Sequence, residues 1–132
     1  MRTLTMAMIL SFVAGSVPAQ PPLREVREID GALLAIGLAD EIRNQCPDIS
    51  GRTFKGYRFI LRLRDRAREL GYSDAQIDAY RKSDVEKSRL KAEGTAYVRA
   101  QGVDMSVPAE WCKLGKSEIE KKSQIGALLR VN

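Results

Sequence analysis

Apolar side chains recur at helical spacing along most of the chain and predict a series of amphipathic helices. Between residues 26 and 46, apolar positions three or four apart predict a first helix. Its middle, residues 31–39, is apolar on nearly all sides, which favours a central buried helix over a surface that meets a partner or a bilayer. A proline and a glycine within residues 47–51 then interrupt the pattern.

A second helix is expected from about Thr53 to Leu70, with Gly71 placed to adopt the left-handed conformation that ends it. At 100° per residue, two faces separate on this helix. The apolar face consists of Phe59, Ile60, Leu63, Ala67 and Leu70. The other face is a basic stripe that consists of Lys55, Arg58, Arg62 and Arg66.

Two serines mark the start of the next helical region. Residues 73–76 have the pattern of a capping box, and a similar signal begins at Ser83. The region up to Gln101 is therefore either a short helix followed by a longer one or a single kinked helix, and Gly102 ends it.

The last part of the chain predicts a further helix and a docked tail. Pro108 suits a first helical turn, and residues 109–122 continue it. In residues 123–132, apolar positions at helical spacing predict one or two more turns, and no alternation typical of strands competes. The predicted fold is all-α, a compact bundle of four or five helices held by one disulfide.

The amino terminus has the pattern of a signal peptide. A basic start precedes an uncharged, largely apolar stretch of 14 residues, 4–17, which is short for a spanning helix. Small residues at Val17 and Ala19 predict cleavage after Ala19; an uncleaved interfacial anchor is the alternative. We therefore expect a periplasmic or secreted protein with one helical domain, residues 20–132, and no transmembrane segment after cleavage.

The two cysteines, Cys46 and Cys112, are expected to form a disulfide. An even number of cysteines in a small exported domain favours a bridge over free thiols. The loop would span about 67 residues, and chain entropy alone would then stabilise the fold by roughly 4 kcal/mol. A redox-active pair is the alternative, but the C-x-x-C spacing of such pairs is absent.

Composition removes much catalytic chemistry. The 132 residues contain no histidine and 6% aromatics, which excludes histidine-based catalysis and most zinc sites. Residues 115–117 resemble part of a phosphate loop, but the required earlier glycine is Glu110. We expect no enzyme activity, no cofactor and no metal. The Ser-x-x-Lys match of Ser88 with Lys91 is expected to be a chance resemblance to a catalytic motif. The carboxylate pairs Asp40 with Glu41 and Glu118 with Glu120 are expected to be surface charge.

The excess positive charge lies on the predicted second helix. Residues 52–70 contain seven basic and two acidic residues, six of the seven being arginine. Such a stripe suits a solvated face, an acidic protein, anionic lipid or nucleic acid, and export argues against nucleic acid. The stripe is the candidate partner-binding site, because guanidinium groups favour carboxylate contacts.

Several short motifs together resemble the domain-of-unknown-function family 5333, whose members are small exported bacterial proteins. They are PPLR (21–24), EID (28–30), ADEIR (39–43), LGYSD (70–74), LG (114–115), EI (118–119), SQIG (123–126) and LLR (128–130), with Cys46, Ile77, Ala79, Tyr80 and Cys112. The resemblance implies no catalytic residue or cofactor. It does imply an accessory or assembly role beside the proton-pumping respiratory NADH:quinone oxidoreductase.

Three functional hypotheses follow. The leading one is a non-enzymatic binding or accessory protein of the cell envelope that meets an acidic or membrane-embedded protein partner. The alternative is a stand-alone periplasmic carrier of a small molecule or lipid in a helical pocket. The third is an enzyme that uses serine, lysine or carboxylate side chains from distant segments. The sequence leaves the oligomeric state open.

Overall fold

The computed structural model of the protein describes residue 15 and residues 19–132. The predicted signal peptide lies almost wholly outside the described residues, so its existence and its cleavage stay predictions. Within the described part, five α-helices, two short 3-10 turns and a small sheet follow the order η1, α1, β1, α2, α3, α4, α5, η2, β2.

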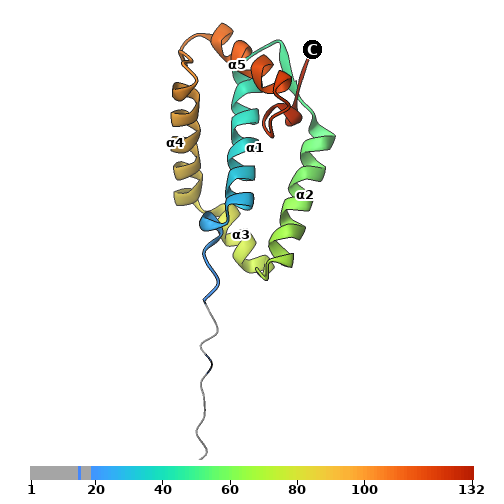
Figure 1. Cartoon of the computed structure of the whole chain (residues 1–132), viewed down its shortest axis with the longest axis vertical. Helices are drawn as coiled ribbons and strands as arrows, with labels where there is room; N and C mark the ends of the chain where they lie inside the picture. Colours follow the sequence, from blue (N-terminus) through green and yellow to red (C-terminus); the bar gives the residue numbers. More distant parts are fainter. Residues whose placement is uncertain (1–14, 16–18) are drawn as a thin grey trace, which may run out of the picture.

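The five helices confirm the all-α bundle. Helix α1 is central, with α4 on one side and α2 on the other, while α5 crosses one end of the bundle and α3 lies at the opposite end (Figure 1). The helices are α1 (Arg27–Gln45), α2 (Thr53–Glu69), α3 (Asp74–Lys82), α4 (Asp84–Ala100) and α5 (Pro108–Glu120). The 3-10 turns are η1 (Leu23–Glu25) and η2 (Gly126–Leu128).

The two serine signals resolve into two helices. The Ser73 hydroxyl accepts a hydrogen bond from the Gln76 backbone N–H, and the Gln76 side chain accepts one from the Ser73 N–H, which completes the predicted capping box. Ser83 ends α3 and caps α4, where its hydroxyl accepts from the Glu86 N–H. Gly71, at φ +91°, takes the predicted left-handed conformation after α2.

The core has a large and a small part, which share α1. The larger part lies where α1, α4, α5 and the carboxyl-terminal tail meet, and Trp111, Ile42 and Leu129 are among its most deeply buried side chains. The smaller part joins η1, α1, α2 and the α2–α3 turn through four buried residues, Leu23, Ile29, Ala67 and Tyr72. The middle of α1 is buried at Ala32, Ala35, Leu38 and Ala39, whereas Gly31 and Gly37 are exposed.

The tail differs from the prediction. Residues 123–132 were expected to add helical turns, but after η2 they form strand β2 (Leu129–Val131), which pairs antiparallel with β1 (Ile49–Gly51). Strands of three residues are too short to show alternation in the sequence. The turn needs Gly126, because a Cβ there would lie 2.0 Å from the Glu118 carbonyl oxygen.

Among residues 15 and 19–132, no helix combines the length and the apolar character needed to cross a membrane.

Candidate binding surfaces

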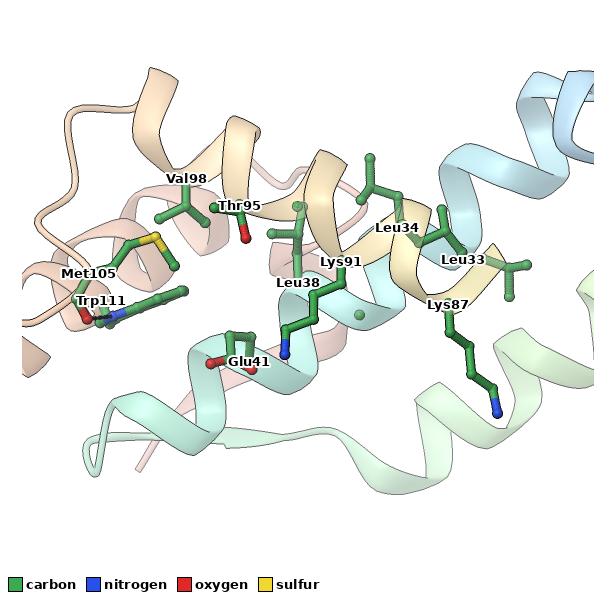
Figure 2. Close-up of a pocket in the computed structure, with 13 residues that line it drawn as sticks. Leu33, Leu34, Leu38, Glu41, Lys87, Lys91, Thr95, Val98, Met105 and Trp111 are labelled. Carbon is green, nitrogen blue, oxygen red and sulfur yellow. Dashed lines mark hydrogen bonds between the residues drawn. The ribbon is translucent and has the colours of Figure 1, made fainter. Parts of the chain in front are cut away.

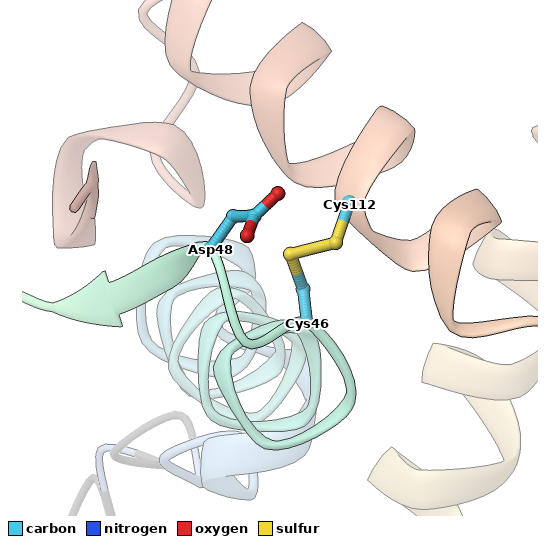
Figure 3. Close-up of side chains that lie close together, drawn as sticks. All are labelled: Cys46, Asp48 and Cys112. Carbon is cyan, nitrogen blue, oxygen red and sulfur yellow. A yellow bond between two sulfur atoms is a disulfide. The ribbon is translucent and has the colours of Figure 1, made fainter.

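The predicted disulfide is present. Cys46 follows α1 and Cys112 lies in α5, and their sulfurs are 2.04 Å apart (Figure 3). The bridge therefore joins the end of the central helix to the helix that crosses it. The Asp48 carboxylate lies beside the two sulfurs. Because each sulfur is bonded to the other, this trio offers no thiolate to a metal ion in the oxidised protein.

The basic stripe of α2 is exposed along its whole length, but its members differ in their partners. Arg66 donates to Glu28 at 2.8 Å and to Glu69 at 3.2 Å. These hydrogen bonds, the one to Glu69 first, raise the pKa of the Arg66 guanidinium. The charge of Arg66 is thus already matched by carboxylates of the same molecule.

The other three stripe residues are available to a partner. Lys55, Arg58 and Arg62 form no ion pair with the residues that the structure describes. The Arg58 guanidinium lies 5.8 Å from the centre of the Phe54 ring, and that of Arg62 lies 5.9 Å from the Phe59 ring. Such cation–π contacts orient a guanidinium without neutralising its charge.

Exposed apolar side chains lie beside these cations. Phe54 is 74% exposed, Tyr57 60% and Ile60 45%. Ile60, which belongs to the predicted apolar face, is exposed because it lies at the edge of that face, where no other element of the described part of the chain covers it. We call Phe54, Lys55, Tyr57, Arg58, Ile60 and Arg62 the α2 outer face.

The aromatic part of this face was missed by the sequence reasoning. Phe54 and Tyr57 stand three residues apart at the start of α2 and could have been recognised as a pair on one side of the helix. Only Ala67 of α2 is fully buried. Helix α2 thus presents most of its surface to solvent or to a partner.

A second surface feature is a groove of about 400 Å³ between α1 and α4 (Figure 2). Its walls are mainly apolar, and Lys87, Lys91 and Glu41 are its charged residues. The Trp111 indole N–H donates to the Met105 carbonyl oxygen at 3.0 Å at one end. The remaining lining residues are Leu33, Leu34, Gly37, Leu38, Leu90, Gly94, Thr95 and Val98.

Two glycines leave room for the groove. Neither Gly37 of α1 nor Gly94 of α4 has a side chain, and a Cβ built on Gly37 would meet no atom within 4 Å. A Cβ on Gly94 would make ordinary contact with Leu38 Cδ2, at 3.5 Å. The sequence reasoning missed this feature, although two glycines inside helices, where glycine is unfavourable, were a usable signal.

A cluster of charged side chains ties the other end of the molecule together. Arg89 of α4 donates to Asp30 of α1 at 3.2 Å and to Glu86 at 2.8 Å. Arg24 also pairs with Glu86, and the Tyr80 hydroxyl donates to Asp30. We call these five residues the ionic cluster. It joins η1, α1, α3 and α4.

The cluster shifts the pKa of three of its members, and the hydrogen bond to Asp30 is the main cause that raises the pKa of Arg89. Burial by itself would raise the pKa of Asp30, but hydrogen bonds from Arg89 and Tyr80 and the positive charges outweigh it, so the pKa is lowered. Burial, together with the hydrogen bond to Asp30, raises the pKa of Tyr80 to about 12. At neutral pH the carboxylate is charged and the phenol is protonated, which are the forms that bond to each other.

The candidates for catalysis are scattered. Residues 115–117 lie inside α5, so they do not form a phosphate-binding loop. Ser88 and Lys91 are exposed on α4, and Lys91 lines the groove. Asp40 pairs with Arg43 of the same helix.

Glu118 is the exception to the expected surface charge. Its side chain is 1% exposed, and its carboxylate accepts a hydrogen bond from the Tyr97 hydroxyl at 2.5 Å. Burial, together with this bond, raises the pKa of Tyr97 to about 12. The prediction of surface charge is wrong here, because sequence spacing does not show which polar residue faces a donor on another helix.

The fold and these features define a small helical-bundle protein with one disulfide, an exposed basic and aromatic helix, and an apolar groove. The chain belongs to the family of unknown function DUF5333, whose family model matches residues 21–130. Neither a search of curated proteins nor a search of solved structures found a match.

Proposed function

We propose that this protein is a non-enzymatic binding or accessory protein of the cell envelope and that the α2 outer face binds an acidic protein partner. One observation carries the proposal: three cations that form no ion pair with any residue the structure describes lie beside three exposed apolar side chains on a single helix.

This combination suits a protein interface. Aromatic residues and arginine are enriched at the centres of interfaces, where apolar area is buried and guanidinium groups meet carboxylates. Arg58 and Arg62 need not give up an ion pair with any residue of the described part of the chain to bind a partner, whereas Arg66 would have to release Glu28 and Glu69. Complementary charge also speeds the first encounter.

The proposed location is the periplasm or the outside of the cell. The predicted signal peptide supports it, and so does the disulfide, since such bridges persist in oxidising compartments. The family resemblance adds the respiratory NADH:quinone oxidoreductase as the complex to examine first, so the proposed partner is an acidic surface exposed on the exported side of a membrane complex.

The test is co-purification of the tagged endogenous protein in mild detergent, with wild type compared with the double variant Arg58→Glu and Arg62→Glu. We expect the variant to lose the oxidoreductase subunits that the wild type carries, while circular dichroism shows an unchanged fold. The matched control is Arg99→Glu with Lys113→Glu, which changes the net charge equally at exposed sites on α4 and α5. Equal recovery of the subunits with both variants would refute the role of α2.

A further inference from the structure

We propose that the groove between α1 and α4 binds a single-chain anionic amphiphile of the fatty-acid class, with its carboxylate at Lys87 and Lys91 and its hydrocarbon tail directed toward Trp111. This inference concerns a different surface from the α2 outer face and does not depend on the proposed partner.

The shape of the groove fits one hydrocarbon chain. Its volume of about 400 Å³ lies within the range of small-molecule sites, and most of its lining side chains are apolar. Leu34 and Leu38 of α1 and Val98 of α4 line the groove (Figure 2), and Leu90 of α4 is a further apolar lining residue. The absent side chains of Gly37 and Gly94 keep this space open.

The two ends of the groove differ in chemistry. Lys87 lies near the start of α4, whereas Met105 and Trp111 stand at the other end, where the indole N–H is already bonded to the Met105 carbonyl (Figure 2). Trp111 itself is buried, so the exposed Met105 side chain beside it is the apolar surface that this end presents to a ligand. An amphiphile matches this polarity, with a polar head at one end and a methyl group at the other.

Charge selects an anion for the head. Lys87 and Lys91 lie one helical turn apart on α4, and Figure 2 shows the Lys91 ammonium directed toward Glu41 and the Lys87 ammonium directed away from it. The two ammonium groups therefore meet one carboxylate only after their flexible side chains rotate. Lys91 forms no ion pair with a described residue, and the pair of Lys87 with the exposed Asp84 is long, at 3.8 Å. Among the residues that the structure describes, Glu41 is the one acidic residue that lines the groove, and its carboxylate accepts a hydrogen bond from Gln45 at 2.8 Å. The cations of the groove thus outnumber its anions.

The single tryptophan of the chain supplies the assay. We would titrate the protein with 11-bromoundecanoate below its micelle concentration and follow quenching of Trp111 fluorescence by the terminal bromine. Saturable quenching that unbrominated undecanoate reverses is the expected result. Quenching without saturation, or without reversal by undecanoate, would overturn the proposal.

A groove-filling variant tests the location. Gly37→Leu places a side chain in the groove and should weaken binding at least about tenfold, which corresponds to the loss of a few apolar contacts. Gly31→Leu is the control, because Gly31 is an exposed glycine of the same helix on a different side, where a Cβ meets no atom within 4 Å and does not line the groove. Both changes replace a helical glycine, so their effects on helix stability match. Equal affinity of the two variants would contradict the assignment.

A charge variant tests the head group. Lys87→Gln with Lys91→Gln should weaken the binding of 11-bromoundecanoate by about tenfold. The binding of 11-bromoundecanol, which has no charge, should be nearly unaffected. Glu41→Gln should increase the affinity for 11-bromoundecanoate, because it removes a negative charge from the groove. An equal loss for the acid and the alcohol would overturn the assignment of the two lysines.

Two further measurements distinguish amphiphile binding in the groove from the α2 proposal and from a contact between two copies of the chain. The variant Arg58→Glu with Arg62→Glu should bind 11-bromoundecanoate as wild type does, so failure of the α2 proposal and failure of this one are distinguishable. Sedimentation of the wild type and of Gly37→Leu gives the oligomeric state. A wild-type dimer that Gly37→Leu dissociates, together with no effect of the amphiphile, would show that the groove is a contact between two copies and would refute the amphiphile site.

Discussion

The two ends of the bundle are held together by different chemistry. At the end where α5 crosses α1, a disulfide and the larger apolar core join helices that lie far apart in the sequence. At the other end, four buried apolar side chains are supplemented by the ionic cluster around Arg89. The disulfide and the apolar contacts of the first end carry no charge, whereas the ionic cluster of the second end depends on the charge of Asp30 and Glu86.

This difference bears on both proposed surfaces. The groove runs from Lys87, beside the ionic end, to Trp111, at the disulfide end. The α2 outer face lies along a helix that is fully buried at one residue, near its carboxyl end. Conditions that loosen the ionic end should therefore affect the head-group end of the groove before they affect the tail end. Four variants test whether the two ends differ in this way.

The largest effect is expected from removal of the disulfide. Replacement of Cys46 and Cys112 by alanine should lower the free energy of unfolding by about 4 kcal/mol, because the bridge closes a loop with a sequence separation of 66. Urea denaturation followed by circular dichroism measures this. Wild type reduced with dithiothreitol is the control and should lose a similar amount. A loss below about 1 kcal/mol would mean that packing at this end suffices without the bridge.

The helices and this bridge were predictable because their signals are local or compositional. The serine caps at Ser73 and Ser83 and the left-handed Gly71 mark helix ends within a few residues, so the helix bounds follow from the sequence. The pairing of two cysteines needs only their number and compartment.

The remaining features depend on contacts between distant segments. The β1–β2 pair joins residues about 80 positions apart through strands of three residues, and no local pattern encodes it. Glu118 is buried beside Tyr97, a hydrogen-bond donor from another helix. Ile60 is exposed because no other element of the described part of the chain packs over it. The groove likewise exists because two glycines on separate helices face the same space. Sequence reasoning found the cations of α2 but not their division into paired and unpaired groups.

An intermediate effect is expected at the ionic end. Replacing Arg89 with methionine leaves Asp30 and Glu86, whose side chains are 14% and 11% exposed, without their shared cation. Because solvent reaches Arg89, this change should cost less than breaking a fully buried ion pair. We expect the free energy of unfolding to fall by about 2 kcal/mol at pH 7.

The same variant should change the pH dependence. The pKa of Asp30 is lowered in the folded protein, so this carboxylate stabilises the fold at neutral pH, and that stability is lost as the pH falls below its ordinary pKa and through the lowered one. Urea denaturation at pH 7 and pH 3 measures the change. Wild type should lose more stability between these two pH values than the Arg89→Met variant does. Equal losses would show that Arg89 does not set the acid sensitivity.

The smallest effects come from removing one hydroxyl at each end, and they compare the two ends directly. Tyr97→Phe deprives the buried Glu118 carboxylate of the one side-chain donor that the described residues give it, and we expect a loss of about 1–2 kcal/mol. Tyr80→Phe removes the same group from Asp30, which keeps two hydrogen bonds from Arg89, so the loss should be about 0.5 kcal/mol. Both phenols have a pKa of about 12, so both hydroxyls are protonated donors at neutral pH.

Urea denaturation of the two variants at pH 7 gives the comparison, and Tyr57→Phe, at an exposed site, is the control for the substitution itself. A larger loss of unfolding free energy for Tyr97→Phe would show that the disulfide end tolerates an unpaired polar group less well than the ionic end. At the ionic end, several charged groups remain hydrogen-bonded to one another after one hydroxyl is removed. A larger loss for Tyr80→Phe would reverse this conclusion. The ionic cluster would then act as one cooperative unit in which each hydrogen bond depends on the others.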